Sequence, residues 1–147
     1  MRINTKIRYG LRTMIEIAST QDENGVLQKD IAKKQNISLK YLDSIISSLK
    51  LKGLVINSKG RGSGYRITRD PKEITMFDIY TAFENIEVVE CINNNGFCER
   101  AKHDCKANYY WNEFRKDFSN MLKSKTLDQI ISSTSFECKE ICELKFD

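Results

Sequence analysis

Hydrophobic residues in the first third of the chain recur at three- and four-residue steps, which predicts amphipathic helices. The first spans residues 3–20, and a shorter one spans residues 28–35. Asn36 is suited to the left-handed conformation that closes a helix, and Ser38 can cap a third helix running to about Lys52. The outer face of this third helix is polar, basic and rich in hydroxyls. Two helices joined by a tight turn predict a helix-turn-helix, whose second helix can enter a DNA major groove.

Short alternating apolar runs then flank a basic, glycine-rich segment, Lys59-Gly-Arg-Gly-Ser-Gly. This pattern predicts a β-hairpin, and a hairpin directly after a helix-turn-helix is a wing. A phosphate-binding loop is the competing interpretation. It is disfavoured because the segment lacks the Gly-Lys-Ser/Thr ending and precedes a strand instead of a helix.

Two capping-box patterns predict helix starts in the second half of the chain, at Thr75–Asp78 and at Thr126–Gln129. Between them, a long helix is predicted from about Lys106. Its large apolar set is Ala107, Tyr110, Trp111, Phe114, Phe118, Met121 and Leu122. A chain of this size cannot easily cover so many, so we expect a two-fold dimer seam, with an ordinary core helix as the alternative.

Composition and charge sharpen this picture. Apolar residues make up 40% and charged residues 30%, which is typical of a helix-rich globular protein. A length of 147 residues suits one compact domain or a small domain with an oligomerisation arm, and we expect the second. Residues 1–70 carry 14 Lys+Arg against 6 Asp+Glu, or +8, and residues 71–147 carry 10 against 14, or −4. The basic half indicates a surface that meets phosphates, although an uneven solvated surface would have the same composition.

The chain has no apolar run of about 18 residues, and its first residues lack the apolar core of a signal peptide. We therefore expect a cytoplasmic protein without a membrane span. In a reducing compartment, its five cysteines are expected to bind metal or to react instead of forming structural disulfides.

Three cysteines, Cys91, Cys98 and Cys105, lie at equal intervals, with six residues between neighbours. Zinc modules usually pair cysteines two to four residues apart, whereas this wider spacing on a loop suits an iron-sulfur cluster. A thiol switch without metal and unmodified cysteines are the alternatives. The fourth ligand stays open among His103, Asp104, Glu90, Asn108 and a residue of a partner subunit.

His103 is a candidate metal ligand, but a lone histidine in a charged loop is more often simply solvated. Cys138 and Cys142 lie four residues apart and would share a helix face if the tail were helical. This spacing could serve a metal or a thiol pair, but we expect both cysteines to be unmodified. No acid/base pair, nucleophile constellation or cofactor fingerprint indicates an enzyme.

Several short motifs occur in a characteristic order: Lys6-x-Arg-Tyr-Gly-Leu-Arg, Asp30-Ile-Ala, Ile37-Ser-x-x-Tyr41-Leu, Gly60-x-Gly-x-Gly-Tyr65 and Ile74-Thr-x-x-Asp78-Ile. As a set, they resemble the IscR/NsrR family of winged-helix bacterial regulators, over nearly the whole chain. The resemblance implies a homodimer held by the long helix, a winged helix-turn-helix that reads a palindromic promoter site, and three cysteines that bind an iron-sulfur cluster.

The same likeness directs Ser38, Lys40, Tyr41 and Asp43 toward DNA and puts Arg61 at the wing tip. The complete set of candidate DNA-binding residues is Arg2, Lys6, Ser38, Lys40, Tyr41, Asp43, Ser44, Lys59 and Arg61. The chain also departs from the family. Iron-sulfur-assembly regulators place a histidine where Asn108 stands, and nitric-oxide sensors place an acidic residue where Arg8 stands.

These observations predict a mainly α fold with a small β wing. Residues 1–86 form the winged helix-turn-helix domain, 87–105 the cysteine sensor loop, 106–135 the dimerisation helix with a short following helix, and 136–147 a tail. The expected function is a dimeric, promoter-binding transcription regulator that senses iron-sulfur status, redox state or nitric oxide. Its expected cofactor is an iron-sulfur cluster, 2Fe-2S with the type left open, on Cys91, Cys98 and Cys105. The alternatives are a thiol-switch or partner-controlled regulator of the same fold, and an iron-sulfur redox protein.

Overall fold

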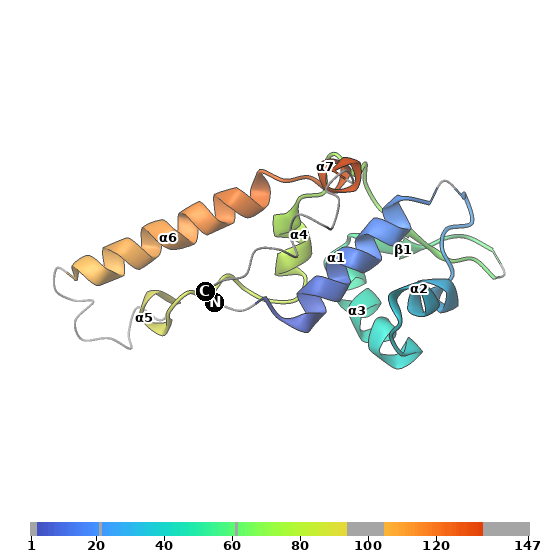
Figure 1. Cartoon of the computed structure of the whole chain (residues 1–147), viewed down its shortest axis with the longest axis horizontal. Helices are drawn as coiled ribbons and strands as arrows, with labels where there is room; N and C mark the ends of the chain where they lie inside the picture. The colour runs from blue at the N-terminus through green and yellow to red at the C-terminus, as the bar shows by residue number, and fades with distance from the viewer. Residues whose placement is uncertain (1–2, 21, 61, 94–104, 134–147) are drawn as a thin grey trace, which may run out of the picture.

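The computed structural model describes residues 3–20, 22–60, 62–93 and 105–133. In these residues the fold consists of helices and one two-stranded sheet (Figure 1). In chain order the elements are α1 (Thr5–Ala18), α2 (Gln28–Gln35), α3 (Leu39–Leu51), β1 (Val55–Asn57), β2 (Tyr65–Ile67), α4 (Met76–Thr81), α5 (Glu90–Asn93), α6 (Lys106–Lys123) and α7 (Leu127–Ser132). The predicted class, mainly α with a small β wing, is confirmed.

Local signals set the ends of the first three helices. The Asn4 side chain caps α1 by accepting a hydrogen bond from the Ile7 amide at 2.8 Å. Asn36 closes α2 in the left-handed conformation, with φ of 52°. The Ser38 hydroxyl then caps α3. The roles predicted for Asn36 and Ser38 are confirmed, and α1 is shorter at both ends than the predicted range of 3–20.

The main core lies where α3 crosses α1 and α2. The inner face of α3 is completely buried, and it packs against residues of the other two helices in one cluster. Its members include Met14, Ile17, Ile31, Leu42, Ile45, Ile46 and Leu49. Burial of an aliphatic side chain of this size stabilises a fold by about 1.5–3 kcal/mol, so this cluster holds α3 rigidly against α1 and α2.

A polar contact at the core's edge fixes α1 against α2. The Glu16 carboxylate accepts a hydrogen bond from Gln35 Nε2 at 2.9 Å and pairs with Lys34 Nζ at 2.5 Å. Glu16 and Gln35 are largely shielded from water, while Lys34 is exposed. Because hydrogen bonds are directional and apolar contacts are not, this contact fixes the position of α1 relative to α2.

The wing is an antiparallel pair in which Val55 faces Ile67 and Asn57 faces Tyr65. Val26 adds a third, single-residue partner, because it exchanges two backbone hydrogen bonds with Tyr65 at 2.8 and 3.0 Å. At Gly64 a Cβ atom would lie 2.2 Å from the Val26 carbonyl, so the close approach of these backbones requires glycine there.

Both predicted capping boxes are present, at Thr75 for α4 and at Thr126 for α7. The two helix starts also pair with each other. The Met76 amide donates to the Lys125 carbonyl at 2.8 Å, and the Leu127 amide donates to the carbonyl of Ile74 at 2.7 Å. Leu127 is completely buried in the core formed by α1, α2 and α3. The chain therefore returns from α6 to the winged-helix domain, and α7 is part of that domain's core.

Helix α6 extends away from the winged-helix domain, with α5 beside its far end (Figure 1). Its C-terminal half packs on α4 and α1 through Ile7, Tyr80, Phe118 and Leu122. Tyr80 and Phe118 meet edge to face, with ring centroids 5.7 Å apart. Tyr110, by contrast, is 59% exposed. The aromatic stripe predicted for this helix thus serves partly as core and partly as free surface.

The packing of α1 against the segment that follows α4 depends on Gly10, which is buried in α1. A Cβ atom at this position would lie 2.2 Å from the ring of Phe83. We expect Gly10→Ala to lower the free energy of unfolding by about 1–3 kcal/mol from overpacking, partly offset by about 0.5–1 kcal/mol of helix propensity. Urea unfolding followed by circular dichroism measures this change.

The Phe83→Leu background provides the control, because it removes the ring atoms that the new methyl group would meet. There Gly10→Ala should be neutral or stabilising. An equal loss of stability in both backgrounds would show that the contact with Phe83 is not the reason for glycine at this position.

Candidate DNA interface and cysteine segment

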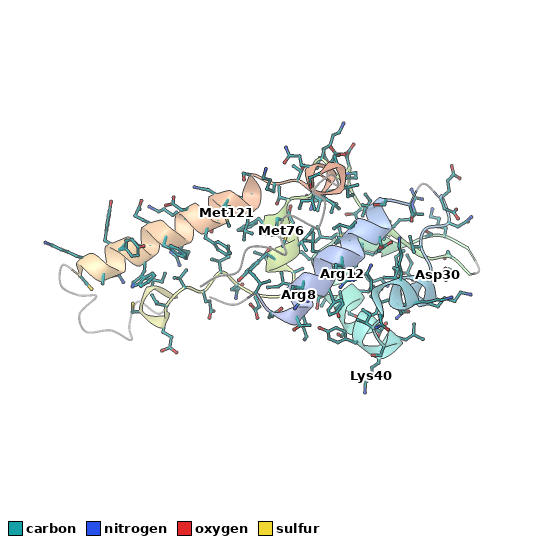
Figure 2. All side chains as sticks on the ribbon, in the orientation of Figure 1. Arg8, Arg12, Asp30, Lys40, Met76 and Met121 are labelled. Atoms are coloured by element: carbon teal, nitrogen blue, oxygen red, sulfur yellow. The ribbon has the colours of Figure 1, made fainter. Side chains whose placement is uncertain are left out.

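The free face of α3 carries the candidate base-reading side chains. Lys40, Asp43 and Ser44 are exposed and lie on one side of the helix, opposite the buried aliphatic face. Figure 2 shows Lys40 projecting away from the domain. The Ser44 hydroxyl donates to the Tyr41 carbonyl at 2.8 Å, so its oxygen stays available as an acceptor. This face has the mixture of charge and hydroxyls that suits a major groove.

Ser38 is the N-cap of α3, as the sequence predicted. Its oxygen accepts the Tyr41 backbone N–H at 3.1 Å and caps the helix, while its own O–H proton remains free to donate. The partial positive charge at a helix N-terminus favours a nearby phosphate. Ser38 therefore combines a stabilising contact with a position suited to the DNA backbone.

Tyr41 is half-buried and packs edge to face on Tyr9 of α1, with ring centroids 5.8 Å apart. The Arg12 guanidinium lies 5.3 Å from the centroid of the Tyr9 ring. Lys6, on the same helix, is exposed. The basic surface thus continues from α3 onto α1. Arg12 ends the motif Lys6-x-Arg-Tyr-Gly-Leu-Arg but was not among the predicted DNA-binding residues, because its place beside Tyr9 and Tyr41 depends on how α1 packs on α3.

Tyr65 connects the wing to the helix-turn-helix. Its hydroxyl donates to Gln28 Oε1 at 3.4 Å, and Lys50 Nζ lies 5.0 Å from its ring centroid. Burial raises the pKa of Tyr65, and the negative charge of Asp43 raises it further. The phenol therefore stays protonated at neutral pH. This junction could not be predicted from the sequence, since a contact across 37 positions leaves no local pattern.

The described ends of the cysteine segment both lie at the start of α6. Cys91 lies in α5 and Cys105 is the N-cap of α6, and both carry free, half-buried thiols. The Asn108 side-chain amide donates to the Cys91 carbonyl at 3.4 Å. The segment expected as a loop contains one helical turn, because buried Ile92 anchors α5.

A chain of hydrogen bonds continues along α6 from this point. Asn112 Nδ2 donates to Asn108 Oδ1 at 2.9 Å and to the Asn108 carbonyl at 3.0 Å. Arg115 Nη2 in turn donates to Asn112 Oδ1 at 3.1 Å. These contacts fix the Asn108 amide in orientation and connect the cysteine end of α6 with its middle.

The remaining site residues lie outside the described part of the chain: Arg2, Arg61, Cys98, His103, Cys138 and Cys142. Lys59, in the segment that connects the two strands of the wing, is described and exposed. Within residues 3–20, 22–60, 62–93 and 105–133, no group of three His, Cys, Asp or Glu side chains is placed to hold a metal ion. In the same ranges, no helix is both long and apolar enough to cross a membrane.

A family model named Rrf2, described as an iron-dependent transcriptional regulator, matches residues 3–133. The chain belongs to the Rrf2 family. This confirms the resemblance to IscR/NsrR-type regulators and identifies the winged helix-turn-helix as that of a transcription regulator. The free face of α3 and the wing are accordingly the candidate DNA-contacting surface of an Rrf2 protein.

Three similar proteins illustrate the family. The chain is 32% identical to the protein rrf2 of Nitratidesulfovibrio vulgaris over 145 residues, 98% of this chain and 96% of the relative. It is 31% identical to the HTH-type transcriptional regulator IscR of Serratia proteamaculans, over 90% of this chain and 80% of the relative. The solved structure of CymR, the global cysteine regulator of B. subtilis, superposes with a TM-score of 0.69 at 34% identity, covering 92% and 99% of the two chains.

The two roles inferred for Ser38 predict separable effects. Ser38→Ala removes the cap and should lower the free energy of unfolding by about 0.5–2 kcal/mol. Ser38→Asp keeps a good capping oxygen, so its stability should stay close to wild type, but its negative charge should weaken DNA binding. Urea unfolding measures the first effect and fluorescence anisotropy with promoter DNA the second. Wild-type DNA affinity in Ser38→Asp would exclude Ser38 from the phosphate-facing surface.

Proposed function

We propose that this Rrf2 regulator is a homodimer that binds promoter DNA and senses its signal through an iron-sulfur cluster held by Cys91, Cys98 and Cys105. The observation that carries the proposal is the position of the cysteines. Cys105 is the N-cap of α6, and the Cys91 carbonyl accepts a hydrogen bond from Asn108 in the first turn of the same helix, while the opposite end of α6 packs on the winged-helix domain. A change at the cysteines therefore acts on an element that contacts the DNA-binding fold.

The described donor atoms fit such a group. Free thiols at Cys91 and Cys105 are the ligand type that iron-sulfur clusters require, and both are partly shielded from water. The N-terminus of an α-helix, where Cys105 lies, favours anionic ligands such as thiolates. A bound cluster would supply a centre that responds to oxidants, nitric oxide or iron supply.

The fourth ligand is proposed to be a residue other than Asn108. This residue stands where iron-sulfur-assembly regulators have a histidine, but its amide nitrogen is engaged with the Cys91 carbonyl and its oxygen accepts from Asn112. As a link between α5 and α6, Asn108 would sense whether the cysteine segment is ordered without touching iron itself. This difference leaves the chain free to respond to a signal other than that of its histidine-bearing relatives.

The DNA-contacting residues are proposed to divide by role. Lys6 and Lys59, together with Arg2 and Arg61, would hold the phosphates, since their charge is sequence-independent. Lys40, Asp43 and Ser44 on the free face of α3 would read base edges. Ser38 and Tyr41 would set the register of α3 through its cap and through its contact with α1.

The dimer is proposed to form along α6. Tyr110, Phe114, Asp117 and Met121 follow one another at steps of four, three and four residues, as in the seam of a coiled coil. Phe114, Asp117, Phe118 and Met121 line an open hollow of about 480 Å³ into which side chains of a second copy would fit. Asp117 would cost some stability within the seam but would restrict the register in which two helices can pair.

A metal-free thiol switch on the same fold is the second candidate. It is favoured by the free thiols of Cys91 and Cys105 and by the similarity to a protein described as the global cysteine regulator of B. subtilis. In that case, oxidation of a thiol in the segment would alter how α5 holds α6. The two candidates share their DNA surface and differ in whether iron is needed.

Iron and sulfide content decides between them. Anaerobically purified protein should contain both elements and absorb visible light. Cys91→Ser, Cys98→Ser and Cys105→Ser should each lose the colour and most of the iron, because a cluster rarely survives loss of a thiolate ligand. Cys138→Ser is the matched control and should keep both.

Promoter-DNA affinity then completes the test. Removing the cluster with a chelator should change the affinity of wild-type protein but leave that of Cys105→Ser as it was. Colourless, iron-free wild-type protein whose DNA affinity instead responds to a thiol oxidant would contradict the cluster and support the thiol switch.

The α6 seam makes a separate prediction. In a two-fold dimer each substitution counts twice, so Met121→Asp should raise the dimer dissociation constant by at least about 100-fold through burial of two unpaired charges. Sedimentation velocity measures the dimer fraction. Asn120→Asp, which adds the same charge on another side of the helix, should leave the dimer intact. Equal effects of the two variants would place the dimer contact elsewhere.

A further inference from the structure

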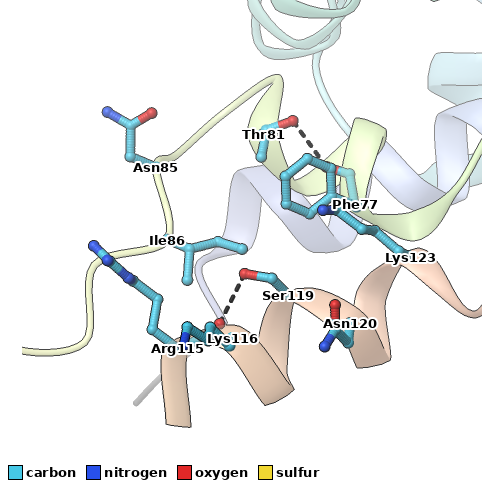
Figure 3. A pocket seen from close by; sticks show the side chains of 9 residues that line it. All are labelled: Phe77, Thr81, Asn85, Ile86, Arg115, Lys116, Ser119, Asn120 and Lys123. Atoms are coloured by element: carbon cyan, nitrogen blue, oxygen red, sulfur yellow. Dashed lines mark hydrogen bonds between the residues drawn. The ribbon is translucent and has the colours of Figure 1, made fainter. Parts of the chain in front are cut away.

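A second candidate site lies between α4 and α6, away from the cysteines. It is an open groove of about 520 Å³. Its lining comes from α4, from the segment that follows α4 and from one side of α6 (Figure 3). The lining residues are Phe77, Thr81, Asn85, Ile86, Arg115, Lys116, Ser119, Asn120 and Lys123.

The charge of this groove is one-sided. Arg115, Lys116 and Lys123 contribute three cations, and none of the lining residues within the described chain is acidic. Glu113, just outside the lining, pairs with Lys116 at 2.8 Å and neutralises part of that charge. Asn85 and Asn120 add amide N–H donors. This set is unusual for the acidic second half of the chain and is suited to an anion.

Two of the three cations are held in place by neighbouring side chains. Arg115 Nη2 is oriented by Asn112 Oδ1 at 3.1 Å. Lys123 Nζ lies over the Phe77 ring, 4.8 Å from its centroid, and Figure 3 shows the two side chains together. Ordering these long side chains in advance reduces the entropy lost on binding. Phe77 and Ile86 also give the groove an apolar part, which a purely inorganic anion would leave uncovered.

The groove and the proposed dimer seam lie on different sides of α6. Lys116 and Lys123 each follow a seam residue, Phe114 and Met121, by two positions, which is about 200° around a helix. A second copy seated on the seam would therefore leave the groove open. Occupation of the groove and dimerisation are compatible.

We propose that this groove binds a small organic anion, a carboxylate or phosphate carried on an apolar body. Arg115, Lys116 and Lys123 contact the anionic group, and Phe77 and Ile86 contact the apolar part. The site goes beyond the proposed function, because it uses none of the cysteines. It gives the regulator a place for a small-molecule signal next to the contact between α6 and α4.

The test uses the full chain and four defined probes in isothermal titration calorimetry: phenyl phosphate, benzoate, inorganic phosphate and benzyl alcohol. Phenyl phosphate or benzoate should bind saturably, and whichever binds tighter identifies the anionic group. The better of the two should bind at least about threefold tighter than inorganic phosphate, since it also covers the apolar part. Benzyl alcohol, which lacks the charge, should not bind measurably.

Substitutions locate the binding. Arg115→Gln, Lys116→Gln and Lys123→Gln should each weaken it by about three- to tenfold, the size expected for one partly exposed ionic contact. Lys125→Gln removes the same charge from an exposed residue outside the groove, and its affinity should match wild type. Circular dichroism confirms that each variant is folded, and the three separate groove variants protect the test against misfolding of any one.

The cluster-free variant Cys91→Ser should bind the same probe with wild-type affinity, so this result and the iron measurement succeed or fail independently. No saturable binding of either organic anion to folded wild-type protein at millimolar concentration would overturn the proposal. An equal loss of affinity in Lys125→Gln would also overturn it, because the effect would then reflect net charge alone.

Discussion

The packing of α4 between α1 and α6 is the contact on which the rest of the structure depends. Tyr80 of α4 lies edge to face with Phe118 of α6, and Ile7 of α1 completes the same buried cluster. Protein interiors are packed at nearly crystalline density, so a tilt of α6 has to move α4 or open this cluster. The backbone pairing of residues 74–76 with 125–127 closes the arrangement from the other side, because it joins the start of α4 to the chain that leaves α6. The DNA-binding fold and the long helix are thereby mechanically connected.

Features that depend on neighbouring residues could be predicted from the sequence. The caps at Ser38, Thr75 and Thr126 and the left-handed Asn36 each rest on contacts within a few positions, and all are present. The helical period of apolar residues predicted α6, and the glycine-rich segment between two apolar runs predicted the wing. The order of these elements already indicated a winged helix-turn-helix, and the family motifs agreed with it. The prediction of the fold was good because its signals are short-range and mutually consistent.

Features that depend on distant residues could not be predicted. Leu127 lies in the core of a domain whose other members precede it by up to 113 positions, counting from Met14, and Tyr65 reaches Gln28 across 37. The groove beside α6 needs residues from both sides of the cysteine segment, and its three cations are ordinary surface charges in the sequence. The sequence likewise could not show which apolar residues of α6 are buried, because their partners in α4 and α1 are distant in the chain. The division between Phe118, which is buried, and Tyr110, which is exposed, follows from where α4 lies.

The two ends of α6 differ in how firmly they are held, and this difference determines how a signal would travel. At the Lys123 end, Phe118 and Leu122 are buried in the cluster with Tyr80, and burial of such side chains contributes about 1.5–3 kcal/mol each. At the cysteine end, burial of the single side chain of Ile92 contributes about 1.5–3 kcal/mol, and the hydrogen bond from Asn108 to the Cys91 carbonyl adds about 0.5–1.5 kcal/mol. The ligand binding or oxidation proposed for the cysteines would therefore act on the less firmly held end, where a modest free energy would be enough to dock or release α5. With the stronger end closed, α6 would move as a rigid rod of about 27 Å, its 18 residues rising 1.5 Å each. Because α4 is fixed to both α6 and α1, such a movement reaches the helices that carry the DNA-contacting surface.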